Sequence, residues 1–381
     1  KKIMSNRLKI GEGKISGYVS IFLASLTFLA VFCFKYPRVF TSPEFREIYT
    51  GEQMKLLLIG TIIASFIFAI FSFILSHKKS YALIGMIIII GTVFIGGLRV
   101  DPNQVVGESK WYLGLDWFLL DLLLMAIIFV PIEMVWPKNA EQNRFHEEWR
   151  TDLVYFAVSH LFIQFFSVIV ASTVTKTFSG FGLSGLHTWI QSLPFAVQLL
   201  LAFFTADFCQ YWAHRFFHSY AYFWRFHSIH HSTKNMDWLA GSRTHFVDIF
   251  VTRCAAFAPI YVFGFSPMVF NIYILFMAIH AVLIHSNTRI NFGFLKYIIA
   301  TPQYHHWHHC EDPKYYGKNF ATIFPFIDRL FGTYYLPKNI WPEGTGLHEA
   351  NYPKGYLKQM VHPFMQSPFD TDLKMEDRAK R

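Results

Sequence analysis

Residues 207–231 read DFCQYWAHRFFHSYAYFWRFHSIHH, and the spacing of the histidines in this stretch decides how the chain is interpreted. His214 and His218 are four residues apart, and His230 and His231 lie three and four residues after His227. Residues three or four apart share one face of a helix, with Cβ atoms about 5–6 Å from one another. The stretch therefore predicts two helical segments that each direct several imidazoles at one place.

Four more histidines downstream extend this pattern. His285 stands alone, and His305, His308 and His309 repeat the order of residues 227–231. Neutral imidazole is the commonest nitrogen ligand of first-row metals. Nine such ligands are too many for one ion, so the sequence predicts a site for two. The predicted ligands are His214, His218, His227, His230, His231, His285, His305, His308 and His309.

The rest of the chain is strongly apolar, with 53% hydrophobic and only 15% charged residues. A bilayer core about 30 Å thick needs roughly 20 apolar residues per spanning helix. The sequence therefore predicts an all-α, polytopic transmembrane bundle with a cytoplasmic, histidine-rich helical cap that holds a dinuclear metal site. The predicted spans are residues 17–34, 56–76, 81–98, 113–136, 153–174, 193–212, 247–263 and 267–284, the last two joined as a tight hairpin.

The distribution of basic residues predicts the orientation of the chain. The formal net charge is +9, and the basic residues are spread along the membrane loops, which favours the positive-inside bias over nucleic-acid binding. Basic residues in the first fourteen positions place the N-terminus in the cytoplasm. Eight spans then put every histidine cluster on that side. We expect a multi-pass protein of a bacterial inner membrane or the endoplasmic reticulum, with its active site facing the cytoplasm.

Neither a disulfide framework nor a cleavable signal peptide is indicated. The four cysteines show no paired spacing and lie mostly in predicted spans. The first apolar run is followed by no small-residue cleavage site, so we expect it to act as a signal anchor.

Three regions follow from the positions of these features. Residues 1–112 are expected to form accessory N-terminal transmembrane helices, because they hold three predicted spans and no clustered chemistry. Residues 113–340 are expected to form the catalytic domain, with its motifs at 207–334. Residues 341–381 are rich in proline, glycine and charge, and we expect a cytoplasmic tail that forms a soluble cap or is partly disordered.

Several polar residues lie beside the predicted ligands. Asp207 is seven residues before His214, so both fall on nearly one helix face, and we expect its carboxylate to accept the second N–H of a metal-bound histidine. His245, at the start of the seventh span, is expected either to support the ligands in the same way or to face the substrate. His280 is expected to be structural, and His306 to face a substrate channel or solvent.

The residue types favour iron over zinc. Structural zinc sites are closed and tetrahedral, often with cysteine ligands, whereas this pattern is histidine-rich and offers more than six ligands. Two ions sharing nine imidazoles, with open positions, suit iron in O2 chemistry.

Four basic residues lie near the histidine clusters and could meet the phosphate of a lipid headgroup. They are Arg215, Arg225, Lys234 and Arg243.

These motifs resemble those of the fatty acid hydroxylase/sterol desaturase superfamily of integral-membrane, non-haem di-iron enzymes. The resemblance rests on the order of the histidine clusters, on the Thr301-Pro302 pair before the last cluster, and on Asn319 and the stretch 328–334 after it. It covers about residues 140–340. The stretch from Arg243 to Asp248 is similar to the family's Arg-x-His-Pro-x-Glu element, with Phe246 in place of the proline and Asp248 as the acid.

The resemblance implies a lipid hydroxylase or desaturase. It implies two iron ions, replaceable by zinc on purification, which use O2 and external electrons to attack an unactivated C–H bond of a fatty acyl or sterol-like substrate. The chain has no His-Pro-Gly-Gly element of a fused cytochrome b5 and no glycine-rich flavin or nicotinamide motif, so a separate redox partner of ferredoxin or cytochrome b5 type is expected. Hydroxylation and desaturation use the same ligands, and the sequence does not separate them.

Three alternatives belong to other classes. A protein of divalent-metal transport or storage would carry ionisable residues through several spans, and here they are few and mostly near the span ends. A membrane zinc hydrolase would need an H-E-x-x-H helix, which the sequence lacks. A family member that has lost catalysis would bind lipid only. Nothing in the sequence indicates the oligomeric state.

Overall fold

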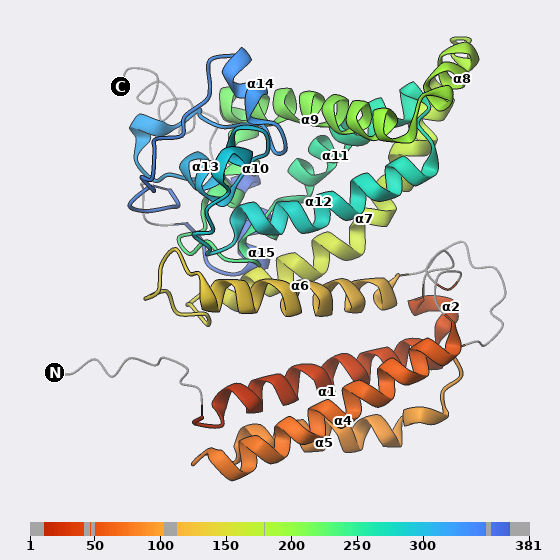
Figure 1. The fold of residues 1–381 in the computed structure, drawn as a ribbon, viewed down its shortest axis with the longest axis vertical. Coiled ribbons are helices and arrows are strands. Elements are labelled where there is room, and N and C mark those ends of the chain that lie inside the picture. Colours follow the sequence, from red (N-terminus) through yellow and green to blue (C-terminus); the bar gives the residue numbers. More distant parts are fainter. Residues whose placement is uncertain are drawn as a thin grey trace. The chain divides into compact units, whose positions relative to one another are not determined.

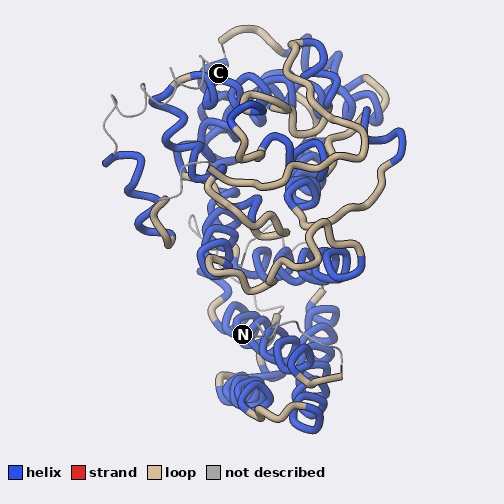
Figure 2. Tube along the Cα trace, turned by 90° about the vertical axis from the view of Figure 1, so that its left-hand side faces the viewer, coloured by secondary structure: helices blue, strands red, loops and turns tan. Residues whose placement is uncertain are grey.

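The computed structural model describes residues 11–41, 46, 50–102, 113–178, 180–347 and 352–365, without the side chains of residues 163, 164, 167 and 168. These residues form helices joined by loops, with no strand beyond two isolated bridges (Figure 2). The chain divides into two compact units, residues 1–126 and 127–381, within helix α6 (Leu115–Val135). The all-α prediction is confirmed for the described residues.

The first unit is a bundle held by small and hydroxyl-bearing residues. Helices α1 (Lys14–Lys35), α4 (Gly51–Leu75) and α5 (Ser80–Phe94) pack on one another, α2 (Pro37–Phe40) and η1 (Gly97–Arg99) are short, and the first part of α6 adds to the same unit. A Cβ atom built on Gly85 would lie 2.3 Å from the Ser20 hydroxyl oxygen, so only glycine fits at this contact. Such small residues let membrane helices approach closely.

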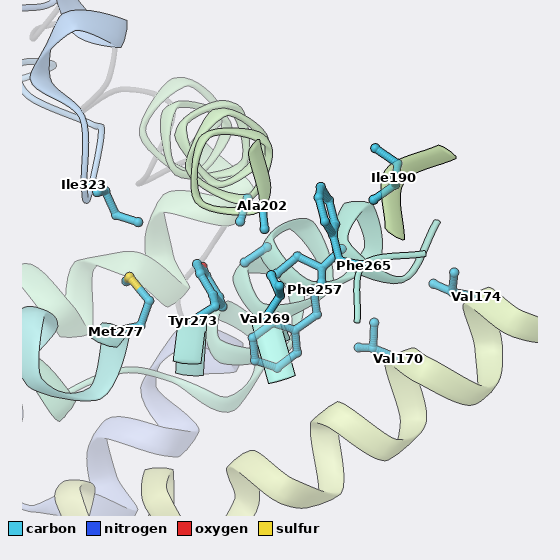
Figure 3. Close-up of a cluster of buried hydrophobic side chains, with 13 residues drawn as sticks. Val170, Val174, Ile190, Ala202, Phe257, Phe265, Val269, Tyr273, Met277 and Ile323 are labelled. Atoms are coloured by element: carbon cyan, nitrogen blue, oxygen red, sulfur yellow. The ribbon is translucent and has the colours of Figure 1, made fainter. Parts of the chain in front are cut away.

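The second unit contains four long helices around one apolar core. They are α7 (Trp149–Phe178), α9 (Phe195–Ser219), α11 (Phe246–Phe263) and α12 (Pro267–His285), with the short α8 (Ser184–Ser192) beside them (Figure 1). Ala202 of α9, Phe257 of α11 and Tyr273 of α12 are fully buried where these helices meet (Figure 3). This core supports the ends of α9 and α12, which carry the histidines.

Several short helices, two of which carry predicted ligand histidines, complete the described part of this unit. They are α10 (Ala221–His231), η2 (Ala240–Ser242), η3 (Gly293–Tyr297), α13 (Pro302–His308), η4 (Pro313–Tyr315), α14 (Pro325–Leu330) and α15 (Tyr356–Met365). Helix α13 is seven residues long and begins at a Thr301 cap with Pro302 in its first turn. Proline is tolerated there because the first turn needs no N–H partner.

The predicted hairpin between α11 and α12 is confirmed. Gly264 ends α11 with a φ of 70°, a left-handed conformation that glycine adopts without strain. Ser266 begins α12, and its hydroxyl accepts a hydrogen bond from the backbone N–H of Val269 at 3.4 Å. The hairpin returns the chain to the level at which α11 began, so the start of α11 and the end of α12 reach the same site.

Within the described residues, six helices are long and apolar enough to cross a membrane: α1, α4, the stretch Ser80–Arg99, α6, α11 and α12. This supports the predicted multi-pass membrane protein. The prediction of eight spans differs from this count for α7 and α9, which are not among the six. Helix α9 buries Gln198, Asp207 and His214, which lowers its apolar character. Four side chains of α7 lie outside the described residues, so the span predicted at residues 153–174 stays a prediction.

The described part of the tail packs against the second unit. Helix α15 contacts α7 and α10, and the Tyr155 hydroxyl donates to the Gln359 side chain at 2.9 Å. Thr345 pairs with Cys310 in an isolated bridge. Residues 348–351 and 366–381 of the predicted tail lie outside the described residues.

Candidate metal centre

The structure brings all nine predicted ligand histidines together in two groups. The five-histidine group combines His214 and His218 of α9, His227 and His231 of α10, and His308 of α13. The four-histidine group combines His230 of α10, His285 of α12, His305 of α13 and His309 directly after it. In each group, one ring nitrogen of every member lies within 4.8 Å of those of the others.

Each H-x2-H-H cluster is divided between the two groups. His227 and His231 are four residues apart and turn toward the five-histidine group, whereas His230 turns toward the other. One residue along a helix is a rotation of about 100°. The rings of His231 and His309 stack with centroids 4.4 Å apart although they belong to different groups. The two groups are therefore neighbours.

Hydrogen bonds on the outer side fix three rings of the five-histidine group. The Nδ1 atoms of His214 and His308 bond to the carbonyl oxygens of Phe320 and Lys318, each at 2.8 Å. The Nδ1 atom of His227 bonds to a carboxylate oxygen of Asp248 at 2.6 Å. Carbonyl and carboxylate oxygens only accept, so each Nδ1 is the donor and each Nε2 carries a free lone pair.

The four-histidine group has fewer such bonds. The Nδ1 atom of His230 bonds to the Arg243 carbonyl at 3.2 Å, and that of His285 to the Ala281 carbonyl at 2.6 Å. The Nδ1 atoms of His305 and His309 are buried and have no hydrogen-bond partner in the described residues. Backbone oxygens alone therefore orient this group.

The inward nitrogens fit a bound cation. His285 Nε2 lies 3.2 Å from His230 Nε2 and 2.9 Å from His305 Nε2, and His305 Nε2 lies 3.1 Å from His309 Nε2. The Nε2 atoms of His218, His231 and His308 are buried without any partner in the described residues. Lone pairs this close repel one another unless a cation lies between them. Metal–nitrogen bonds of about 2.1 Å separate opposite ligands by about 4 Å, near the observed spread.

Burial keeps these imidazoles neutral. It lowers the pKa values of His230, His231, His305 and His309 well below their ordinary value, and the neighbouring histidines lower them further. Burial lowers the pKa of His308 to about 3, although its bond to the Lys318 carbonyl opposes the shift. Neutral imidazole is the form that binds metals. At neutral pH the site is therefore ready to accept cations.

Among the described residues Asp207 accepts no hydrogen bond from a histidine, which differs from the expectation for it. Its carboxylate accepts the backbone N–H groups of Thr322, Ile323 and Phe324 at 2.9, 3.1 and 2.7 Å and the Thr322 hydroxyl at 2.8 Å. These bonds hold the strip whose Phe320 carbonyl receives His214. The helical spacing was right, but loop N–H groups more than a hundred residues away take the carboxylate.

His245 does not contact the ligand histidines through any hydrogen bond in the described residues. Its Nδ1 accepts the Val247 N–H at 3.1 Å and caps α11, and its Nε2 bonds to the Met360 carbonyl at 3.1 Å. The supporting role expected of it belongs to Asp248, three residues later. The acid position of the Arg-x-His-Pro-x-Glu element was the available signal for this residue.

The other expectations near the site had mixed outcomes. His280 is structural, as predicted, because its Nε2 bonds to the Thr322 carbonyl at 2.9 Å. His306 is fully buried, so the prediction that it faces solvent was wrong. Its ring packs on that of Trp341 with centroids 5.3 Å apart. It also lines a small polar cavity, together with Lys138 and Asn287.

Three of the four cations expected to meet a lipid headgroup are engaged within the protein. The Arg243 guanidinium is buried and pairs with Asp152 at 2.6 Å and with Glu148 at 2.7 Å. Arg225 donates to the carbonyls of Tyr222 and Pro363, and Arg215 donates to the Tyr211 hydroxyl. Lys234 lines the same polar cavity as His306.

Two supporting residues were missed. Asp328 accepts the backbone N–H groups of Phe320 and Ala321, both at 2.8 Å, and the hydroxyls of Thr333 at 2.7 Å and Tyr304. Gly241 packs against His285: a Cβ atom there would lie 2.8 Å from the ring Nδ1. The stretch 328–334 was noted only as part of the resemblance, and no local pattern marks Gly241.

The part of the chain that carries the histidines is similar to a known family and to several known proteins. The family model described as fatty acid hydroxylase matches residues 199–333. An ornithine lipid hydroxylase of Rhizobium tropici is 31% identical over 178 residues, 47% of this chain and 54% of the relative. An alkylglycerol monooxygenase of Xenopus tropicalis is 31% identical over 162 residues, 42% of this chain and 36% of the relative. A methylsterol monooxygenase of Arabidopsis thaliana is 22% identical over 241 residues, 59% of this chain and 79% of the relative.

The first two matches cover less than half of this chain. The chain spans about half the length of the ornithine lipid hydroxylase and about a third of that of the alkylglycerol monooxygenase. No solved structure shows a significant match to it. The relatives are named as lipid or sterol hydroxylases and monooxygenases, which gives no support to metal transport or storage. The predicted resemblance is confirmed: residues 199–333, which contain all nine of these histidines, match the fatty acid hydroxylase family model, and eight of the nine are buried, with His218 half-buried.

Proposed function

We propose that this protein is a membrane monooxygenase that uses O2 and external electrons to hydroxylate, or desaturate, an unactivated C–H bond of a lipid. The observation that carries the proposal is the convergence of nine histidine nitrogens in two adjoining groups, in a chain that has membrane-length helices. The names of the relatives support the reaction class and the lipid substrate. We assign the catalytic domain to residues 113–340, and residues 1–112 and 341–381 to the accessory helices and the tail.

The two groups suit two iron ions, one in each, with zinc as a substitute after purification. The nine histidines are the proposed ligands, and their donor set is all nitrogen, which favours iron, copper or zinc over the hard ions that prefer oxygen. Iron bound there would supply the activation of O2 and the oxidation of the C–H bond.

The residues of the chain would prepare the site for that chemistry. Asp248 and four backbone carbonyls hold the outer Nδ1 atoms of five of the nine rings, so these five rings would be kept turned toward the ions. Burial of the ligands excludes bulk water, which would otherwise quench a strong oxidant. We expect the lipid substrate to enter the site between the helices, because it resides in the bilayer.

We place the centre on the cytoplasmic side. The predicted set of eight spans and the six found among the described residues are both even in number, so either set places the N-terminus and His285 on the same side of the membrane. The basic N-terminal segment then orients that side to the cytoplasm. A soluble redox partner of ferredoxin or cytochrome b5 type would reach the site there.

The test combines metal content with product analysis. Wild-type protein purified in detergent is compared with His231→Ala and His309→Ala, one from each group, and with His77→Ala, an exposed histidine in the first unit. Each protein is analysed for metal, loaded with iron, and incubated with O2, a ferredoxin system and a membrane lipid extract. We expect two metal ions in the wild type and His77→Ala, and lipid products that have gained one oxygen or lost two hydrogens.

Each outcome decides the proposal. The variants at His231 and His309 should each lose an ion and form no product. A wild type that binds two ions but oxidises no lipid class in the extract would leave a binding protein. Metal content near zero, unchanged by the substitutions, would overturn the centre itself.

A further inference from the structure

Helix α15 carries an apolar stripe that faces away from the protein. Leu357, Val361, Phe364 and Met365 recur at intervals of four, three and one residues and so lie on one face of the helix. They are 76, 52, 59 and 77% exposed. An amphipathic helix in a soluble cap turns this face inward, whereas here it is turned outward.

The opposite face of α15 is fastened to the catalytic unit. Gln359 and Pro363 are buried, and Gln359 accepts a hydrogen bond from the Tyr155 hydroxyl. The Pro363 carbonyl accepts from the Arg225 guanidinium at 3.1 Å, and the Met360 carbonyl bonds to His245 at 3.1 Å. The orientation of the helix is therefore fixed by polar contacts, and the exposed stripe does not result from loose packing.

The exposed stripe continues onto the surface of a membrane-length helix. The Phe364 ring stacks on that of Phe246, the first residue of the candidate span α11, with centroids 6.4 Å apart. Phe246 and Phe250, one turn further, are themselves 51 and 41% exposed. Since α11 begins at Phe246, α15 lies at the level where that helix enters the bilayer.

The charges beside the stripe suit the same surroundings. Lys358 is exposed next to Leu357, and Lys354 lies just before the helix, where it pairs with Glu147 at 2.6 Å. Basic residues that flank an apolar face are typical of helices that lie in the interface and meet anionic headgroups.

We propose that α15 is an interfacial helix whose Leu357, Val361, Phe364 and Met365 side chains insert into the bilayer surface on the side of the histidine centre. Through Met360 and His245, which caps α11, this helix is joined to the turn that carries Asp248 and hence to His227. Contact with the membrane surface thereby holds α15 in place, and α15 supports the turn that positions Asp248 and His227. This inference concerns the placement of the tail and holds whichever reaction the centre catalyses.

Photo-crosslinking in liposomes tests this placement directly. A benzophenone amino acid is introduced at Val361 in one protein, at Lys358 in a second and at Phe250 in a third, each otherwise unchanged. After reconstitution into vesicles of phosphatidylcholine and phosphatidylglycerol and irradiation, the adducts are identified by mass spectrometry. We expect lipid adducts at 361 and 250, and a much smaller yield at 358, which points to the headgroup level or water.

Two further measurements keep the result decisive. The metal content of each variant must match that of the wild type, which shows that the fold is kept. A spin label on Val361→Cys, in a chain whose four natural cysteines are replaced by alanine, should collide with O2 more than with a water-soluble nickel chelate, and one on Glu311→Cys should show the reverse. Position 361 behaving like 311, or giving no lipid adduct while 250 does, would overturn the proposal.

Discussion

The two histidine groups use the same ligand type but are supported differently. In the five-histidine group, two carbonyls and the Asp248 carboxylate hold the outer nitrogens. In the four-histidine group, only backbone carbonyls do so, for His230 and His285, and the outer nitrogens of His305 and His309 have no partner in the described residues. A carboxylate on the outer nitrogen makes an imidazole a stronger ligand, and fixed rings lose less freedom on binding.

This difference indicates that the two groups bind their metal ions with different strength. The five-histidine group should hold its ion tightly, and the four-histidine group should bind more weakly and exchange more readily. Removal of metal by a chelator should therefore occur in two steps, with the four-histidine group emptied first. The predictions below test this asymmetry, from the largest effect to the smallest.

Removal of a ligand should have the largest effect. His231→Ala should empty the five-histidine group and His309→Ala the four-histidine group, and each should lower lipid oxidation by more than about 100-fold, since loss of a ligand should exceed the cost of losing its support. Titration with a chelator, followed by metal analysis, should show that the ion kept by His309→Ala resists removal better than the ion kept by His231→Ala. Equal resistance would contradict the asymmetry.

Loss of the carboxylate should remove most of the difference between the groups. Asp248→Ala should weaken metal binding at the five-histidine group by about 10–100-fold, with Asp248→Asn between it and the wild type because the amide oxygen still accepts. Competition with a chromophoric chelator measures the affinity. Asp207→Ala is the contrasting variant: it leaves buried N–H groups of residues 322–324 unpaired, so it should lower the thermal stability before it changes the affinity ratio of the groups.

Gly241→Ala should act on the four-histidine group alone. The new methyl group would lie 2.8 Å from Nδ1 and 2.9 Å from Cγ of His285, so the ring must move away from its position. We expect about tenfold weaker binding in that group and no change in the other. Gly185→Ala is the matched control, because nothing lies within 4 Å of a Cβ atom there. A decrease in both groups would show that the two sites are coupled.

The pH dependence of the metal-free protein should show the smallest effect. The pKa values of His230, His231, His305, His308 and His309 are lowered in the fold, so the unfolded chain binds more protons below about pH 6.5. The free energy of unfolding should therefore fall between pH 7 and 5. The pKa of His146 is raised: burial opposes the shift, but the hydrogen bond and charge of Asp237 and the charge of Asp152 outweigh it. Its contribution is present below pH 6.5 and is lost as the pH rises through that raised pKa.

Thermal unfolding in detergent across this range checks the sign. The metal-free wild type should unfold at lower temperature at pH 5 than at pH 7, and the metal-loaded protein should show a steeper loss as the histidines are protonated. Stability that rises on acidification would mean that His146 outweighs the five buried histidines.

The sequence by itself indicated the nine histidines that gather in the structure, the helical spacing that brings them together and the membrane character of the chain. These features follow from local rules: histidines three and four residues apart share a helix face, and apolar runs of sufficient length are stable in lipid. The hairpin at Gly264 is set by equally local turn chemistry. Of the eight expected spans, six are found among the described residues, and hydropathy alone did not show that the polar residues of α9 contact a buried site.

Only the tertiary structure decided how the nine histidines divide and what holds each one. His214 receives its acceptor from Phe320, 106 residues away, and His227 bonds to Asp248 rather than to a carboxylate on its own helix. Asp207 lies on the buried face of α9, as His214 does, yet its carboxylate accepts backbone N–H groups of a distant loop in place of an imidazole N–H. Hydrogen-bond partners depend on where remote segments pack, and helical periodicity carries no information about that. The same holds for α15, whose apolar stripe is evident in the sequence but whose outward direction is set by Tyr155, Arg225 and His245.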